Sequence, residues 1–210
     1  HGDRAASVAL LQVVAGGVQL QFSGKTGIDL PDEQASRFPY AVDYYNKRYG
    51  ARGWSNAVVL NLAIGQGEND QTVVNMARFY AALATGGQAP RPEIVRRSPE
   101  RVPVMKLTDA QLQGLRRAMA GVVSAGGTAA SARIEGVTLA GKTGTAQNAQ
   151  DPKNDHAWFV GFAPMDQPKI VVAVMLEFGG HGYRAARIAS KIIESYLKQP
   201  TTVLPRQDVE

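Results

Sequence analysis

One stretch of the chain, residues 139–147, concentrates residue types that could hold and polarise a peptide. It reads Leu-Ala-Gly-Lys-Thr-Gly-Thr-Ala-Gln, so a single lysine lies among small residues and two hydroxyls. Side chains alternate between the faces of a strand. We therefore expect Lys142 and Gly144 on one face, and Thr143 and Thr145 on the other. Because Gly144 adds no bulk, another backbone could lie against this edge. Such an edge suits an extended peptide ending in a carboxylate, held by strand addition and charge-assisted hydrogen bonds.

Hydrophobic periodicity predicts the elements that would position this stretch. Helices are expected over residues 5–14, 72–84, 108–124 and 184–197. Strands are expected over residues 139–147, 156–164 and 169–177, with a short edge strand over 93–97. Thr72 and Thr108 are expected helix N-caps, and Gln111 completes a capping box with Thr108. Three strands in succession indicate an antiparallel sheet.

The same periodicity predicts which residues face the core. The helix over 108–124 is expected to bury Leu112, Leu115, Met119, Val122 and Val123. The closing helix is expected to present Ile188, Ile192 and Leu197 on one side. Residues 34–54 are polar and aromatic, and we expect them to form a surface excursion with a solvated basic face.

Composition bounds the class of protein. The 210 residues are 44% hydrophobic and 20% charged, which is typical of one large globular domain, or of one domain with a fragment of another. The absence of cysteine excludes disulfides and thiolate metal sites. The net charge of +5 is modest and scattered, so no nucleic-acid partner is expected. Three scattered histidines show no metal-ligand spacing, and no apolar run reaches the roughly 18 residues of a membrane span.

Several longer blocks point to a known family. The Lys-Thr-Gly of residues 142–144, taken alone, favours a simple turn between two strands, because a three-residue match often arises by chance. A second copy lies within residues 24–31, Gly-Lys-Thr-Gly-Ile-Asp-Leu-Pro, and residues 61–67 read Asn-Leu-Ala-Ile-Gly-Gln-Gly. Both blocks resemble segments of class B penicillin-binding proteins, and residues 142–144 resemble the third signature motif of that family. From residue 22 to 197 the chain is similar to the C-terminal part of an elongation-type transpeptidase domain.

This resemblance implies a fold and an activity. The fold would be α/β (α+β), of the penicillin-binding protein and serine β-lactamase type, with an antiparallel sheet of about five strands flanked by helices. Part of that domain would be absent, so residues 1–198 would be a partial transpeptidase domain and 199–210 a polar tail. The activity would be peptidoglycan cross-linking through an acyl-enzyme formed on D-Ala-D-Ala stem peptides, which β-lactams mimic.

The resemblance also assigns roles to individual residues. Lys142 and Thr145 would be catalytic, because Lys142 would polarise the site and the backbone N–H of Thr145 would be an oxyanion-hole donor. Thr143, Gly144, Thr145 and Gln147 would bind substrate. No metal and no cofactor are implied. Glycan-polymerising and elongation-complex membrane proteins would be further partners, at the periplasmic face of the bacterial inner membrane, with the membrane anchor outside this chain.

The nucleophile of this family is the serine of a Ser-x-x-Lys motif, followed by a Ser-x-Asn or Ser-x-Asp motif, and both should precede the Lys25 segment. The serines that stand before Lys25 are Ser7 and Ser23, and neither fits. Acyl transfer needs an activated nucleophile. We therefore expect this chain to lack the nucleophile motif and to be inactive alone.

Two alternatives remain open from the sequence. Lys-Thr-Gly at 142–144, followed by Trp158-Phe-Val-Gly161, also resembles the pattern of a class D-like serine β-lactamase or a β-lactam sensor domain. The missing motifs would instead fit a non-catalytic relative that binds a wall polymer or a partner.

Overall fold

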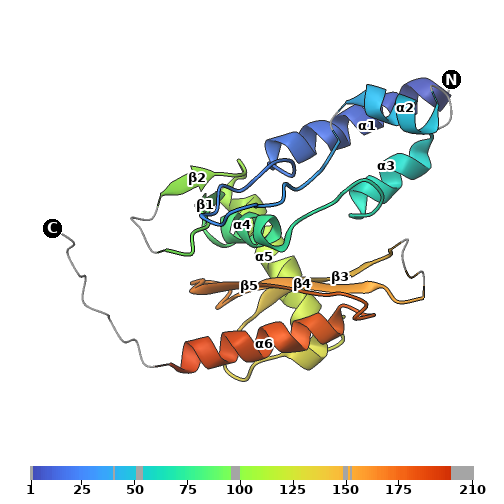
Figure 1. The fold of residues 1–210 in the computed structure, drawn as a ribbon. Helices are drawn as coiled ribbons and strands as arrows, with labels where there is room; N and C mark the ends of the chain where they lie inside the picture. Colours follow the sequence, from blue (N-terminus) through green and yellow to red (C-terminus); the bar gives the residue numbers. More distant parts are fainter. Residues whose placement is uncertain are drawn as a thin grey trace.

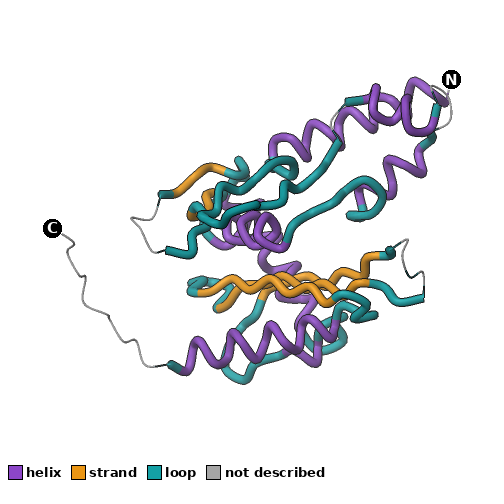
Figure 2. Tube along the Cα trace, in the orientation of Figure 1, coloured by secondary structure: helices purple, strands orange, loops and turns teal. Residues whose placement is uncertain are grey.

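The computed structural model describes residues 2–39, 41–50, 54–95, 100–148, 151 and 153–199, with the backbone alone for residues 2–7. The helices are α1 (Gly2–Gln19), α2 (Val42–Tyr49), α3 (Asn56–Ala63), α4 (Val73–Ala84), α5 (Asp109–Val123) and α6 (Tyr183–Lys198). The strands are β1 (Gln88–Pro90), β2 (Arg101–Pro103), β3 (Ala140–Ala146), β4 (His156–Ala163) and β5 (Ile170–Leu176), and a short 3-10 helix covers Ala130–Ala132. Figures 1 and 2 show their arrangement.

The predicted hairpin succession forms one antiparallel sheet in the order β3-β4-β5. Gly144 lies opposite Trp158, and Trp158 lies opposite Met175. The remaining two strands, β1 and β2, pair with each other in a separate ladder. The α/β class with antiparallel sheets and flanking helices is confirmed, although the described strands are divided between two sheets instead of being joined in one. This order leaves β3 at an edge of its sheet.

Helices cover both faces of the three-stranded sheet (Figure 1). On one face, α6 packs its alanines against Phe159 and the rest of the larger core cluster. On the other face, Tyr80 and Leu83 of α4 pack with Val160 and Phe162 of the sheet. The helix α5 lies against β3. Caps form as the sequence predicts, because Thr72 accepts from the backbone N–H of residue 75 and Thr108 forms a capping box with residue 111.

Two of the predicted helix faces need correction. Ile188 and Ile192 are 41% and 46% exposed, and α6 instead buries Ile193 together with Ala185, Ala186 and Ala189. Short alanine side chains let the helix lie close to the sheet, which places the larger isoleucines on the outer face. On α5, Leu115 is 43% exposed, whereas Leu112, Met119 and Val123 are buried as expected.

The expectation of a surface excursion over residues 34–54 is wrong for three of its aromatic residues, whereas Tyr44 and Tyr49 are exposed as expected. Phe38, Tyr45 and Trp54 are buried in a cluster with residues of α1 and α3. The hydroxyl of Tyr45 donates to the carbonyl of Pro39 at 3.1 Å, and the indole of Trp54 donates to Asn46 at 2.8 Å. Burial raises the pKa of Tyr45 to about 12. Residues 40 and 51–53 of this stretch lie outside the described residues.

The edge strand expected over residues 93–97 is also wrong where the structure describes it, over 93–95. The backbone N–H groups of Ile94 and Val95 are bound by the carboxylate of Asp29, the second at 3.1 Å, so they are not available to a strand ladder. Residues 96 and 97 lie outside the described residues. The domain boundary after residue 198 stays a prediction, although α6 ends there.

The segment that carries the second Lys-Thr-Gly is a structured loop, as expected. The carboxylate of Glu33 accepts the backbone N–H of Thr26 at 2.6 Å, its hydroxyl at 2.6 Å and the N–H of Gly27 at 3.0 Å. Desolvation alone would raise the pKa of Glu33, but these hydrogen bonds outweigh it and hold the pKa below its usual value. This Lys-Thr-Gly copy is therefore held in a loop by the Glu33 carboxylate, whereas the copy at 142–144 lies in the strand β3.

Candidate functional site

The open edge of β3 presents backbone groups of alternate residues. The carbonyl of Thr143 accepts the ammonium of Lys142 at 2.7 Å, and the carbonyl of Thr145 accepts the side-chain amide of Gln66 at 2.9 Å. Both donors come from outside the ladder with β4, so both carbonyls point away from β4. The N–H and C=O of one residue point to the same side of an antiparallel strand. The N–H groups of Thr143 and Thr145 therefore point off the same edge.

The strand β3 is buried up to Gly141 and becomes accessible to solvent from Lys142 onward. Ala140 and Gly141 are buried, while Lys142 and Thr145 are exposed and Thr143 and its glycine neighbour are half-buried. The helix α5 lies against β3 and contributes core contacts with Ala140. The accessible part of the edge is therefore the part that carries the Lys-Thr-Gly-Thr sequence.

Neighbouring atoms approach closely in the middle of this edge, which favours glycine there. A Cβ atom on Gly144 would lie 3.1 Å from the Cβ of Trp158, its partner across the ladder. A Cβ atom on Gly182, just before α6, would lie 2.6 Å from the carbonyl oxygen of Gly144. The first turn of α6 is thus seated on the backbone of the candidate site.

The lysine and the hydroxyls have the placement that the alternation predicts. The ammonium of Lys142 is at the strand edge, and since an ammonium has three donors, its bond to Thr143 leaves capacity for an anion. The hydroxyl of Thr143 is 2.9 Å from the hydroxyl of Thr128, which fixes it on the opposite face. Gln147 follows the strand and is exposed. The structure thus brings Lys142, Thr143, Gly144 and Thr145 to one edge, with Gln147 beyond its end.

Gln66 is a residue of this site that sequence reasoning missed. Its side chain crosses from the loop after α3 to the edge of β3, which is 79 residues away in the chain. Its local signals are the family block of residues 61–67 and its position between Gly65 and Gly67, which adopt φ values of +80° and +68°. Glycine adopts such positive φ values without steric cost, so the two glycines permit the tight turn that carries Gln66.

One expectation about the nucleophile needs correction, because a Ser-x-x-Lys tetrapeptide does occur in the chain. Ser195-Tyr-Leu-Lys198 fits the letters, but it follows β3 in sequence and lies at the end of α6. Lys198 is paired with Glu194 at 2.7 Å. Gly182 contacts the candidate site at the start of the helix, and Ser195 is 13 residues further on, about 20 Å at 1.5 Å per residue. This tetrapeptide is therefore remote from the edge of β3.

An antiparallel sheet with helices on both faces and Lys-Thr-Gly on its open edge is typical of the class of penicillin-binding and serine β-lactamase-type proteins. Residues 14–194 match the family described as "Penicillin binding protein transpeptidase domain", so the chain belongs to that family. The match, together with the relatives below, favours the transpeptidase over the β-lactamase alternative.

The relatives agree with this assignment. The chain is 31% identical over 203 residues to the peptidoglycan D,D-transpeptidase MrdA of Acinetobacter baumannii, covering 85% of this chain and 30% of the relative. It resembles the structure of Pseudomonas aeruginosa PBP2 in complex with WCK 5153 with a TM-score of 0.76 and 31% identity, covering 90% and 44% of the two chains. A complex of PBP2 and MreC from Helicobacter pylori gives a TM-score of 0.75 at 28% identity, covering 88% and 35%. The chain spans about a third of the length of the curated relatives it matches.

Proposed function

We propose that this chain forms the substrate-binding part of an elongation-type peptidoglycan DD-transpeptidase, with β3 as the strand that receives the D-Ala-D-Ala end of a stem peptide. The observation that carries the proposal is the shared direction of the Thr143 and Thr145 backbone groups, with the Lys142 ammonium at the same open edge. An added strand would satisfy these backbone groups, as in other cases of peptide recognition by strand addition.

The edge of β3 would both bind the peptide and polarise its scissile carbonyl group. The peptide carboxylate would be held by the hydroxyls of Thr143 and Thr145 and by the charge of Lys142, while Gly144 leaves room for the peptide backbone. The scissile carbonyl oxygen would lie against the N–H of Thr145. A single donor of this kind typically contributes about 3–4 kcal/mol of transition-state stabilisation. Gln147 would contact the peptide beyond the strand end.

Acyl transfer would need a serine that this edge does not supply. In that step the serine Oγ forms a bond to the carbonyl carbon of the penultimate D-Ala, the bond to the terminal D-Ala breaks, and the leaving amine takes a proton. The serine would come from a Ser-x-x-Lys motif preceding the Lys25 segment, and Ser7 and Ser23 do not provide one. We therefore propose that these 210 residues bind substrate but do not turn it over alone.

Location and partners follow from the same proposal. The complete protein would act at the periplasmic face of the bacterial inner membrane, on peptidoglycan stem peptides and β-lactams. Glycan-polymerising and elongation-complex membrane proteins would be its partners, which the PBP2–MreC complex among the structural relatives supports. In the described ranges, no helix has both the length and the apolar character that a membrane crossing requires.

Binding to the edge is tested with an acylated D-Ala-D-Ala peptide followed by NMR. We expect saturable shifts of the backbone amide signals of Thr143 and Thr145, because their N–H groups point off the edge. The same acylated peptide with L-Ala-L-Ala is the matched control and is expected to bind much more weakly. Equal responses to both peptides, or shifts confined to residues away from β3, would contradict the proposed function.

The absence of turnover is tested separately with a fluorescent penicillin. We expect no covalent label on the chain after denaturation, because the serine motif does not lie near β3. An intact class B penicillin-binding protein serves as the positive control. Stoichiometric labelling would refute the expectation, and loss of that label in Ser195→Ala would identify the tetrapeptide on α6 as the nucleophile.

A further inference from the structure

The side chain of Gln66 occupies a backbone acceptor that a bound peptide would use. Its amide nitrogen lies 2.9 Å from the carbonyl oxygen of Thr145, which is the distance at which the N–H of an added strand would lie. The carbonyl points off the open edge of β3, so an incoming peptide and this amide approach the same oxygen from the same side. This contact plays no part in the reaction proposed above.

The loop that carries Gln66 is built to hold the residue in place. The backbone N–H of Gln66 donates to the carbonyl of Asn61 at 2.8 Å, which closes the loop onto the end of α3. On either side, Gly65 and Gly67 adopt positive φ values that other residues rarely take. The loop is tied to α2 as well, because the Glu68 side chain is only 7% exposed and pairs with Arg48 at 3.0 Å.

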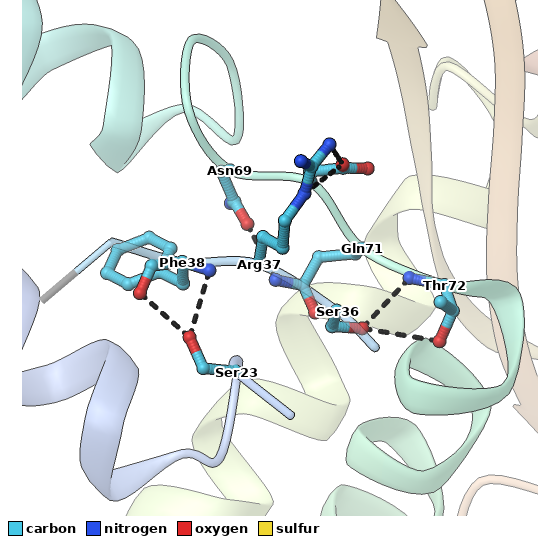
Figure 3. A network of polar contacts seen from close by, with 8 residues as sticks. Ser23, Ser36, Arg37, Phe38, Asn69, Gln71 and Thr72 are labelled. Atoms are coloured by element: carbon cyan, nitrogen blue, oxygen red, sulfur yellow. Dashed lines mark hydrogen bonds and ion pairs between the residues drawn. The ribbon is translucent and has the colours of Figure 1, made fainter. Parts of the chain in front are cut away.

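The far end of the same loop is fixed by a second network, shown in Figure 3. Arg37 and Asp70 exchange backbone hydrogen bonds of 2.7 and 2.9 Å, and their side chains pair at 2.7 Å. The hydroxyl of Ser36 accepts the backbone N–H of Thr72 at 3.0 Å, and Ser23 in turn binds both backbone groups of Phe38. The loop backbone is therefore anchored at both ends, and the Gln66 side chain can move without it.

We propose that Gln66 is a latch on the peptide-binding edge. In the peptide-free chain its amide satisfies the Thr145 carbonyl and covers an otherwise exposed strand edge, which protects that edge from unwanted pairing. When a peptide adds to β3, the side chain swings away and the peptide N–H takes its place. The latch rests on the proposed function of the edge, and it makes Gln66 a positioning residue that lowers peptide affinity by the strength of one hydrogen bond.

The latch predicts tighter peptide binding when the amide is removed. A side-chain hydrogen bond of ordinary net strength corresponds to an affinity change of about two- to tenfold. In NMR titrations with the acylated D-Ala-D-Ala peptide, we therefore expect Gln66→Ala to bind that much more tightly than the wild-type chain. Gln66→Met keeps the length of the side chain without a donor and is expected to change affinity in the same direction. Gln34→Ala is the matched control, since Gln34 also donates to a backbone carbonyl, at 3.1 Å, but away from β3.

Each outcome bears on the latch or on the edge. Unchanged or weaker binding in Gln66→Ala would overturn the latch, and so would a gain that Gln66→Met does not share. If neither the wild-type chain nor any variant binds the peptide, the proposed function of the edge fails. The contact between Gln66 and Thr145 is then tested in the peptide-free chain by hydrogen exchange. In that case the Gln66 amide protons must exchange more slowly with solvent than those of the exposed Gln147, and equal exchange would overturn it.

Discussion

Replacing Gly182 by alanine is expected to lower the free energy of unfolding by about 1–3 kcal/mol, the usual cost of forcing extra volume into packed structure. A Cβ atom there would lie 2.6 and 3.0 Å from the carbonyl oxygen and nitrogen of Gly144, and 2.8 Å from the carbonyl oxygen of Trp158. These are backbone atoms of β3 and β4, so they cannot rotate away. The start of α6 would have to move off the candidate site, and we expect weaker D-Ala-D-Ala binding as well. Urea denaturation and the NMR titration measure the two effects.

A matched substitution at a second glycine distinguishes the steric overlap at Gly182 from the general effect of replacing glycine by alanine. Gly182 has φ −57° and ψ −20°, which alanine adopts without strain. Gly114 lies within α5, and a Cβ atom there would meet nothing within 4 Å. Gly114→Ala is therefore expected to stabilise the chain by roughly 0.5–1 kcal/mol through helix propensity. If both substitutions stabilise the protein, the close seating of α6 on β3 is not the constraint inferred here.

The sequence alone was sufficient to predict the elements that build the edge. Strand and helix periods are local properties, so β3, β4, β5, α4 and α5 fall within one or two residues of their expected bounds. The alternation of Lys142 and Gly144 against Thr143 and Thr145 is equally local, since it depends only on the strand period. The capping box of Thr108 also needs only neighbours in the chain.

What could not be predicted depends on distances between elements. Hydrophobicity favoured Ile188 and Ile192 as the buried face of α6, but the close approach to the sheet selects alanines such as Ala189 instead. The burial of Phe38, Tyr45 and Trp54 could not be predicted either, because it depends on how α1 and α3 pack around them. The backbone of residues 94–95 bonds to Asp29, a contact with no local pattern.

The candidate site also combines features that could be predicted locally with one that could not. The residues on β3 could be predicted from their order in the sequence alone. Gln66 was not, because its contact with Thr145 spans 79 residues and depends on how the loop after α3 is anchored. Motif resemblance marked the Gly-Gln-Gly segment as a family block, but only the geometry shows which backbone group its amide reaches.

Phe159→Ala is expected to lower the free energy of unfolding by about 3–5 kcal/mol, the usual range for truncating a buried aromatic side chain to alanine. The ring is fully buried. Its edge lies over Gly141 and Gly161, where added Cβ atoms would come within 2.3 and 2.8 Å of ring carbons. Two glycines have no side chains that could move into the space. Domains of this size are typically stable by only about 5–15 kcal/mol, so we expect a large shift of the urea midpoint, or an unfolded chain.

The candidate site should respond to this substitution as well, because Phe159 lies directly opposite Thr143 in the ladder between β3 and β4. Phe178→Ala is the matched control. Its ring is 45% exposed and contacts the ring of His156 with centroids 5.2 Å apart, so its loss is expected to cost less than about 1 kcal/mol. Equal losses from the two substitutions would mean that the sheet does not depend on the Phe159 ring. A loss confined to Phe159→Ala, with weaker D-Ala-D-Ala binding whenever the variant still folds, would show that the peptide-binding edge is held in place by the core behind it.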